Sequence, residues 1–145
     1  MTKKTYYTYN DIFLVPQYTE LESRKAADTS TIFGGMKLDI PFISANMDTI
    51  TGPEMAKALW NIGAIGALHR FNDTEGAIKD YVNVRHNDGK DIAGECIVSI
   101  GVNKDFKQRA IALYGVGARL FVVDVAHGHS AQVKNTLCWL RKEFA

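Results

Sequence analysis

Four short apolar runs in this sequence each end in side chains that donate or accept hydrogen bonds or carry a charge. These endings are residues 44–49, 69–70, 99–101 and 124–130, and they supply Ser, Asn, Asp, Arg and His side chains. Chemistry in parallel α/β folds gathers at the carboxyl ends of the strands. If the apolar runs are parallel strands, their endings meet at one rim, and the sequence predicts a polar binding site there.

Simpler structural roles stay open for the same residues. Asp124 can cap a neighbouring loop, and Ser130 has the position of an N-cap before a helix. Asn46 and Asp48 can shape the loop after the first run, and Met47 can belong to the core.

The histidines and cysteines do not predict a metal site. His127 and His129 have the spacing of neighbours on one face of a strand, but no third ligand is nearby. Cys96 and Cys138 lie in no CxxC or similar spacing. We expect two reduced, mostly buried thiols, as in a cytoplasmic protein.

The elements that position these residues follow from the pattern of apolar runs. Residues 40–47, 64–69, 96–101 and 120–125 are short and apolar without clean alternation, which is typical of strands buried on both faces. An amphipathic segment follows each run, beginning near Pro53, Asp73, Asn103 and Ser130. Four units of strand and helix predict an α/β fold, either an open sheet or part of a barrel.

The apolar spacing also predicts which helix faces are buried. The expected core positions are Met55, Ala58, Leu59 and Ile62; Ala77, Ile78, Tyr81 and Val82; Phe106, Ala110 and Leu113; and Val133, Leu137, Leu140 and Phe144. Residues 1–39 lack the pattern and predict an irregular N-terminal extension or hairpin before a domain at 40–145.

Composition excludes several classes of protein. The chain has 145 residues, of which 46% are hydrophobic and 23% charged, and its net charge of +1 favours binding to neither nucleic acid nor membranes. Neither a Walker motif nor a GxGxxG turn after a strand is present, so a Rossmann fold has no support. The first residues lack the apolar core of a signal peptide, and we expect a cytoplasmic protein.

Five ordered motifs resemble the IMP dehydrogenase/GMP reductase family. They are Tyr9-Asn-Asp-Ile-Phe-Leu-Val-Pro16, the segment from Glu22-Ser-Arg24 to Asp28-Thr-Ser30, Ser44-Ala-Asn-Met-Asp-Thr49 with Glu54-Met55-Ala56, Gly66-Ala-Leu-His-Arg70, and Val123-Asp-Val-Ala-His-Gly-His-Ser130. The resemblance covers nearly the whole chain. It implies the N-terminal half of a (β/α)8 TIM barrel, with about four βα units.

The resemblance also implies site residues and ligands. The purine nucleotide, GMP or IMP, contacts the positions of Met47 and Ala45. The nicotinamide cofactor, NADPH or NAD, contacts the positions of Asp124, Val125, Ala126 and Arg70. In GMP reductases the pair matching Ser23 and Arg24 reaches the cofactor of a neighbouring subunit in a tetramer. Such roles suit the chemistry, because carboxylates accept hydrogen bonds from ribose hydroxyls and arginines bind phosphate oxygens.

The sequence departs from the family at the catalytic residue. The family's nucleophile is a cysteine in a loop resembling GxGxGSxCxT, and these 145 residues contain no such segment. Neither Cys96 nor Cys138 takes its place, so the sequence predicts no catalytic residue of its own. We expect the chain to be incomplete without a C-terminal half and, alone, to turn over neither GMP nor IMP.

Two activities and two further classes of function remain open. Ser23-Arg24, Asp28-Thr-Ser30, Gly34-Gly35 and the lack of an inserted regulatory module after Arg70 favour a GMP reductase, which converts GMP to IMP and ammonia with NADPH. Ala126-His-Gly-His-Ser130 favours an IMP dehydrogenase, which oxidises IMP to XMP with NAD. A non-catalytic remnant or one piece of a split enzyme is the alternative, and a flavodoxin-like binding module is a weaker one. Open strand edges predict a homo-oligomer or a complementary C-terminal chain, rather than a stable monomer.

Overall fold

The computed structural model describes residues 4–92 and 94–144, and its centre is a three-stranded parallel sheet. Strands β3 (Ala67–Leu68), β6 (Ile97–Ile100) and β7 (Leu120–Val123) lie in the order β3-β6-β7. A single parallel bridge between Ile43 and Ile65 adds the first apolar run at the β3 edge. The predicted strand over residues 40–47 is therefore reduced to one bridge, and Pro41 within it has no N–H to donate.

A helix follows each of the four predicted strand positions. The helices are α1 (Pro53–Asn61), α2 (Thr74–Arg85), α3 (Phe106–Gly115) and α4 (Ala131–Phe144). Asp73 caps α2 by accepting a hydrogen bond from Gly76 N at 2.7 Å, and Ser130 Oγ accepts one from Val133 N at 3.3 Å at the start of α4. Gly63 follows α1 with φ +80°, as expected of a residue that ends a helix. The predicted order of the four helices and of the strands β3, β6 and β7 is confirmed.

Two antiparallel hairpins add to this framework. Strands β1 (Thr31–Phe33) and β2 (Met36–Leu38) turn at Gly34 and Gly35, whose φ values of +57° and +84° suit glycine. Strands β4 (His86–Asn87) and β5 (Lys90–Asp91) form a second, shorter hairpin between α2 and β6, which the apolar pattern did not predict. The first hairpin lies within residues 1–39, for which the sequence predicts an irregular extension or hairpin.

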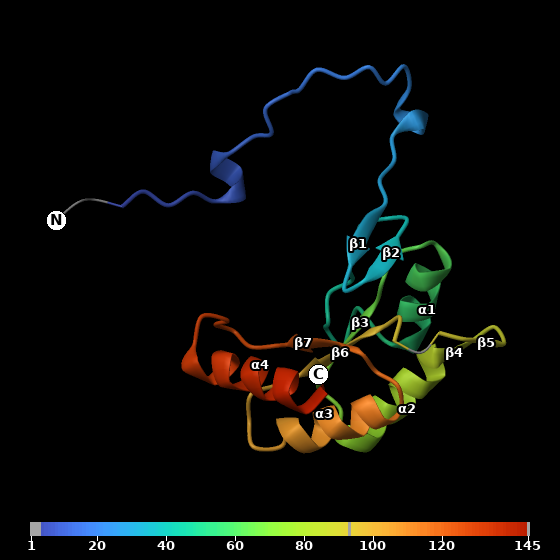
Figure 1. Ribbon diagram of the computed structural model, residues 1–145, viewed down its shortest axis with the longest axis vertical. Helices are drawn as coiled ribbons and strands as arrows, with labels where there is room; N and C mark the ends of the chain where they lie inside the picture. The colour runs from blue at the N-terminus through green and yellow to red at the C-terminus, as the bar shows by residue number, and fades with distance from the viewer. Residues whose placement is uncertain (1–3, 93, 145) are drawn as a thin grey trace.

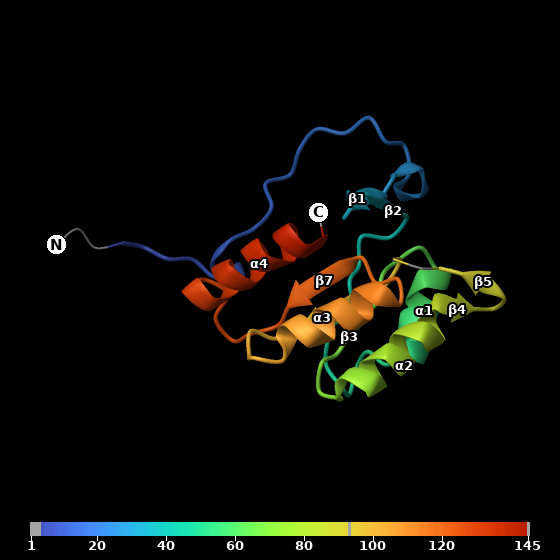
Figure 2. The same ribbon diagram turned by 60° about the horizontal axis from the view of Figure 1, so that its bottom comes forward.

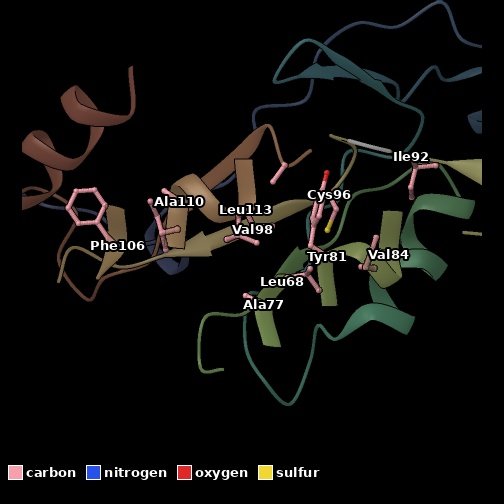
Figure 3. Packing of buried hydrophobic residues seen from close by; sticks show 13 residues of the cluster. Leu68, Ala77, Tyr81, Val84, Ile92, Cys96, Val98, Phe106, Ala110 and Leu113 are labelled. Carbon is pink, nitrogen blue, oxygen red and sulfur yellow. The ribbon is translucent and has the colours of Figure 1, made fainter. Parts of the chain in front are cut away.

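The main core lies between the sheet and its helices. Leu68, Val98 and Ile100 point from the sheet toward α2 and α3, where Tyr81 and Leu113 are fully buried. Figure 3 shows Tyr81 beside Cys96, with Leu68 and Val84 close to it. A smaller cluster lies on the opposite face of the sheet, where Leu38 of β2 covers Ile65, Ala67 and Ile97. Figure 2 shows α1, α2 and α3 on one side of the strands and the β1–β2 hairpin on the other.

The burial of α1 contradicts the predicted face of that helix. Ala56 is its buried residue, whereas Met55 and Ile62, two expected core positions, are 45% and 56% exposed. The cause is Gly66: a Cβ on this glycine would lie 2.6 Å from the Cα and Cβ of Ala56. The helix therefore approaches the sheet through Ala56 at a place that only glycine leaves open.

The other helix faces agree with the prediction to different degrees. In α3 all of the predicted apolar positions are buried, and in α2 Ala77 and Tyr81 are buried. In α4 Leu140 and Phe144 pack against the core as predicted, but Leu137 is 48% exposed and Thr136 is buried in its place.

The chain before the first hairpin forms an extended arm, residues 4–28, that stands apart from the sheet and helices (Figure 1). Its regular structure is limited to short 3-10 turns at Tyr9–Asp11 and Arg24–Ala26. No helix in the described part of the chain has the length and apolar character needed to cross a membrane.

Tyr81 provides a test of this packing. Its ring is fully buried and its hydroxyl accepts a hydrogen bond from Gly94 N at 2.8 Å. Tyr81→Phe leaves that N–H without its acceptor, so we expect the free energy of unfolding to fall by about 1–3 kcal/mol in urea titrations. Tyr7→Phe, at an exposed position of the arm, is the control. Equal stability of the two variants would show that this hydrogen bond does not hold α2 to the segment before β6.

Candidate functional site

The carboxyl ends of the parallel strands bring Arg70 and Asp124 together. Arg70, just after β3, donates from Nε to the Oδ2 of Asp124 at 3.0 Å and to its backbone oxygen at 3.1 Å. Asp124, just after β7, is held in turn by a hydrogen bond from its N–H to the oxygen of Ile100 at 2.9 Å. The pair therefore spans the end of the intervening strand β6.

The ion pair is accessible, and the strand ends make room for it. The side chains of Arg70 and Asp124 are 32% and 29% exposed, so a ligand at the rim can reach both. Arg70 lies over Gly101, and a Cβ on that glycine would come within 3.6 Å of Nη1. A partly exposed pair of this kind adds at most about 1 kcal/mol to stability, so its main effect is to orient the two side chains.

A buried arginine, Arg109 of α3, forms hydrogen bonds to two of the segments that make up the rim. It is 6% exposed and donates to Asn72 O at 2.8 Å, to Asn72 Oδ1 at 2.9 Å and to Ser99 O at 3.4 Å. Burial lowers the pKa of Arg109, with Asp105 acting in the opposite direction. The sequence analysis missed this residue, although a charged residue between Phe106 and Ala110 on an apolar helix face was a signal for it.

Asn72 also forms a hydrogen bond to α2. Its Nδ2 donates to Asp80 Oδ2 of α2 at 2.7 Å, while its oxygens accept from Arg109. The loop after β3, which carries Arg70, is thus fixed to both α2 and α3.

Hydroxyl groups fix the loop after the first apolar run. Ser99 Oγ donates to Leu68 O at 2.6 Å and accepts from Asn46 Nδ2 at 3.2 Å. Thr51, which is fully buried, lies with its Oγ1 2.8 Å from Ser44 Oγ, and Ser44 Oγ accepts from Ala67 N at 3.2 Å. These contacts give Asn46 and Ser44 structural roles and place residues 44–51 beside the ends of β3 and β6.

The proposed nucleotide contacts lie on this fixed loop. Met47 is 49% exposed, so its thioether is available to a ligand and is not part of the core. The oxygen of Ala45 accepts a hydrogen bond from Thr51 Oγ1 at 2.5 Å.

The remaining predicted cofactor residues are not gathered at one point. Val125 is half-buried and Ala126 exposed, and both follow Asp124 in the loop before α4. Ser23 and Arg24 lie on the N-terminal arm, where Ser23 Oγ accepts from Lys25 N at 3.2 Å, and Figure 1 shows the arm apart from the ends of β6 and β7. Within one copy the structure does not bring this pair to Asp124.

The histidines after β7 do not lie on a strand as predicted. β7 ends at Val123, and His127 and His129 are exposed in the loop that follows. The backbone leaves the sheet after Asp124, so alternation along a strand does not apply there. Among the described residues there is no group of three potential metal ligands. The same loop borders a groove of about 630 Å³ with α4, lined partly by His129, Leu137 and Arg141.

The two cysteines differ in exposure, and the expectation that both are buried is wrong for one of them. Cys138 is exposed on α4, whereas Cys96 is 2% exposed and its Sγ lies 3.4 Å from Gly66 O. Burial raises the pKa of the Cys96 thiol to about 12, so the thiol is protonated at neutral pH. Neither cysteine lies at the rim with Arg70 and Asp124.

Thiol labelling tests this assignment. At pH 8 we expect iodoacetamide to modify Cys138 in the folded protein, and Cys96 only after denaturation, because burial excludes both reagent and thiolate. The Cys96 thiol has a pKa of 9.0 in the unfolded chain and about 12 in the folded protein. Its contribution to the free energy of unfolding is therefore fully present below pH 9.0 and is lost as the pH rises toward 12. Mass spectrometry locates the label, and Cys138→Ser should remove all labelling of the folded protein. Rapid modification of Cys96 in that variant would contradict its burial.

Several known proteins are similar to this chain. A family model described as the IMP dehydrogenase / GMP reductase domain matches residues 6–145. A GMP reductase from Streptococcus agalactiae serotype V (strain ATCC BAA-611 / 2603 V/R) is 35% identical over 138 residues, which cover 94% of this chain and 40% of that protein. An inosine-5'-monophosphate dehydrogenase from Cryptosporidium parvum is 29% identical, covering 90% and 42%.

A solved structure shares the fold. The inosine 5' monophosphate dehydrogenase from Legionella pneumophila superposes with a TM-score of 0.79 at 42% sequence identity, covering 93% of this chain and 40% of that chain. The protein described here thus spans about two fifths of the length of these relatives. The match over residues 6–145 shows that the chain belongs to the IMP dehydrogenase/GMP reductase family.

Proposed function

We propose that this chain is the N-terminal part of a purine nucleotide oxidoreductase of the GMP reductase type. The observation that carries the proposal is the accessible Arg70–Asp124 pair at the carboxyl ends of parallel strands, in a chain whose family match runs from residue 6 to residue 145. The corresponding reaction converts GMP and NADPH to IMP, ammonia and NADP. These residues supply the binding surface for nucleotide and cofactor.

We propose further that the four strand–helix units are the first half of a closed (β/α)8 barrel. The parallel order and the helices on one face of the sheet are those of a barrel segment. The first apolar run and β7 are at the two edges, where unpaired backbone groups favour further pairing. The site is complete only with a C-terminal half, on this or a second chain, and the assembly is a homo-oligomer.

The rim residues fit a nicotinamide cofactor chemically. Arg70 holds Oδ2 of Asp124, and Oδ1 of the same carboxylate carries none of the described hydrogen bonds. It is therefore available to accept from ribose hydroxyls, while the guanidinium of Arg70 can bind phosphate oxygens. The cofactor, when bound, supplies the hydride. Val125 and Ala126 border it, and Ser23 and Arg24 reach it from a neighbouring subunit.

Met47 and Ala45 hold the purine nucleotide. The exposed thioether of Met47 provides an apolar surface for a flat ring, and Thr51 fixes the backbone at Ala45. Because Asn46 between them bonds Ser99, the loop is preorganised before ligand arrives.

An IMP dehydrogenase is the second candidate. The segment Ala126-His-Gly-His-Ser130 and the 42% identity to the Legionella enzyme favour it. The reductase is favoured by Ser23-Arg24, by Gly34-Gly35 in the β1–β2 turn, and by the direct passage from Arg70 into α2, which begins at Thr74. The alternative of a non-catalytic remnant predicts the same fold without turnover.

Cofactor binding tests the assignment of Asp124. Without a C-terminal half we expect weak cofactor affinity, with a Kd on the order of millimolar, which corresponds to about 4 kcal/mol of binding free energy. We expect Asp124→Ala to weaken NADPH binding by roughly tenfold or more, because a charged acceptor for the ribose is lost. Cys138→Ala, away from the rim, should leave binding unchanged. A calorimetric titration in which Cys138→Ala has the larger effect would remove Asp124 from the site.

Activity tests the reaction. Alone, the chain should turn over neither GMP with NADPH nor IMP with NAD, because it lacks the family's cysteine loop. Addition of the C-terminal segment of the Streptococcus agalactiae relative should produce NADPH consumption with GMP, followed by absorbance. Consumption of NAD with IMP instead would favour the dehydrogenase, and no turnover in the mixed sample would favour the remnant.

A further inference from the structure

Phe71 is an exposed aromatic residue at the rim. It is 64% exposed and directly follows Arg70, the residue that pairs with Asp124. The guanidinium carbon of Arg70 lies 5.6 Å from the centroid of the Phe71 ring. The same guanidinium therefore lies next to both the carboxylate of Asp124 and an exposed aromatic ring.

The neighbours of Phe71 hold its ring in a fixed place. Phe71 N donates a hydrogen bond to Nδ1 of His69 at 3.2 Å, and the two rings stack with centroids 6.1 Å apart and an angle of 24° between their planes. The next residue, Asn72, accepts from Arg109 of α3 and donates to Asp80 of α2. Because the ring is held before a ligand arrives, binding to it costs little conformational entropy.

An exposed and fixed phenyl ring suits a ligand with a flat ring. Covering the apolar face is favourable, and offset-stacked rings gain a further contribution. The bases of nucleotides stack on aromatic side chains in this way without specific hydrogen bonds. Arg70 and Asp124 suit phosphate and ribose groups. With Phe71, the rim therefore has one side chain for each of the three parts of a nucleotide.

We propose that Phe71 stacks on a heteroaromatic ring of the dinucleotide cofactor, either nicotinamide or adenine. The inference rests on the proposed cofactor site and adds a contact to the ring to those made with ribose and phosphate. Arg70 joins these contacts, because its Nε holds Asp124 while its guanidinium lies beside Phe71. Met47, the proposed purine contact, lies on a different loop. Cofactor therefore covers Phe71, whereas GMP alone does not.

Ring-current shifts in proton NMR test the stacking on the full chain. Protons that lie over an aromatic face resonate upfield, and a weakly bound ligand in fast exchange reports this shift. In a titration of the wild-type chain with NADPH, we expect upfield shifts of the nicotinamide or the adenine protons, and the set that moves identifies the ring. Phe71→Leu should abolish most of the shift extrapolated to saturation and weaken affinity by roughly three- to tenfold. Phe71→Tyr, which keeps a ring, should retain the shift.

Phe42→Leu is the matched control. Phe42 is 66% exposed and precedes the Ile43–Ile65 bridge, so it does not lie at the carboxyl ends of the strands. Its substitution should change neither the shift nor the affinity.

Three results would overturn the inference. Saturable NADPH binding with the same shift in Phe71→Leu would overturn it and leave the proposed cofactor site intact. A wild-type chain without saturable NADPH binding would overturn both. A shift of the guanine proton of GMP that depends on Phe71, without one for NADPH, would assign the ring to the purine nucleotide instead.

Discussion

Arg109 is the residue on which the rim of the sheet depends. A guanidinium buried to this degree is stable only where its donors are satisfied, and here Asn72 and Ser99 provide three acceptors on two segments. The loop after β3 and the end of β6 are therefore held at fixed positions relative to α3. Arg70 follows β3 directly, so its approach to Asp124 rests on this buried contact as much as on the attraction between the two charges.

The sequence predicted the order of strands and helices because that order follows from local patterns. Apolar runs, Pro53, Asp73 and Ser130 mark strands and helix starts without reference to the rest of the chain. Arg70 and Asp124 were predicted to lie at one rim because parallel strands end at one edge, but their direct ion pair was not predicted. The burial of Arg109 was not predicted, because it depends on which face of α3 meets the sheet. A charged residue among the apolar positions of a helix does not by itself show that it is buried.

The errors concern features that hydrophobic periodicity does not report. The expected face of α1 was inferred from hydrophobicity, but the contact is set by Ala56 and Gly66, two small residues that carry little hydrophobic signal. The first apolar run contributes a single bridge because Pro41 and the turn at 48–50 leave little regular strand between them. The contact of α1 depends on the distance between elements, and the short first strand depends on local backbone geometry.

The packing of Gly66 against α1 affects the position of the loop over residues 44–51. Any side chain at this position pushes against Ala56 and displaces the helix, and α1 begins directly after Thr51 and Gly52. Thr51 in turn contacts Ser44 and Ala45, on the loop that carries Met47. A displacement of α1 at Ala56 therefore also moves the start of the helix, which lies next to the loop at the rim. A side chain at position 66 is therefore expected to shift the loop that carries Met47.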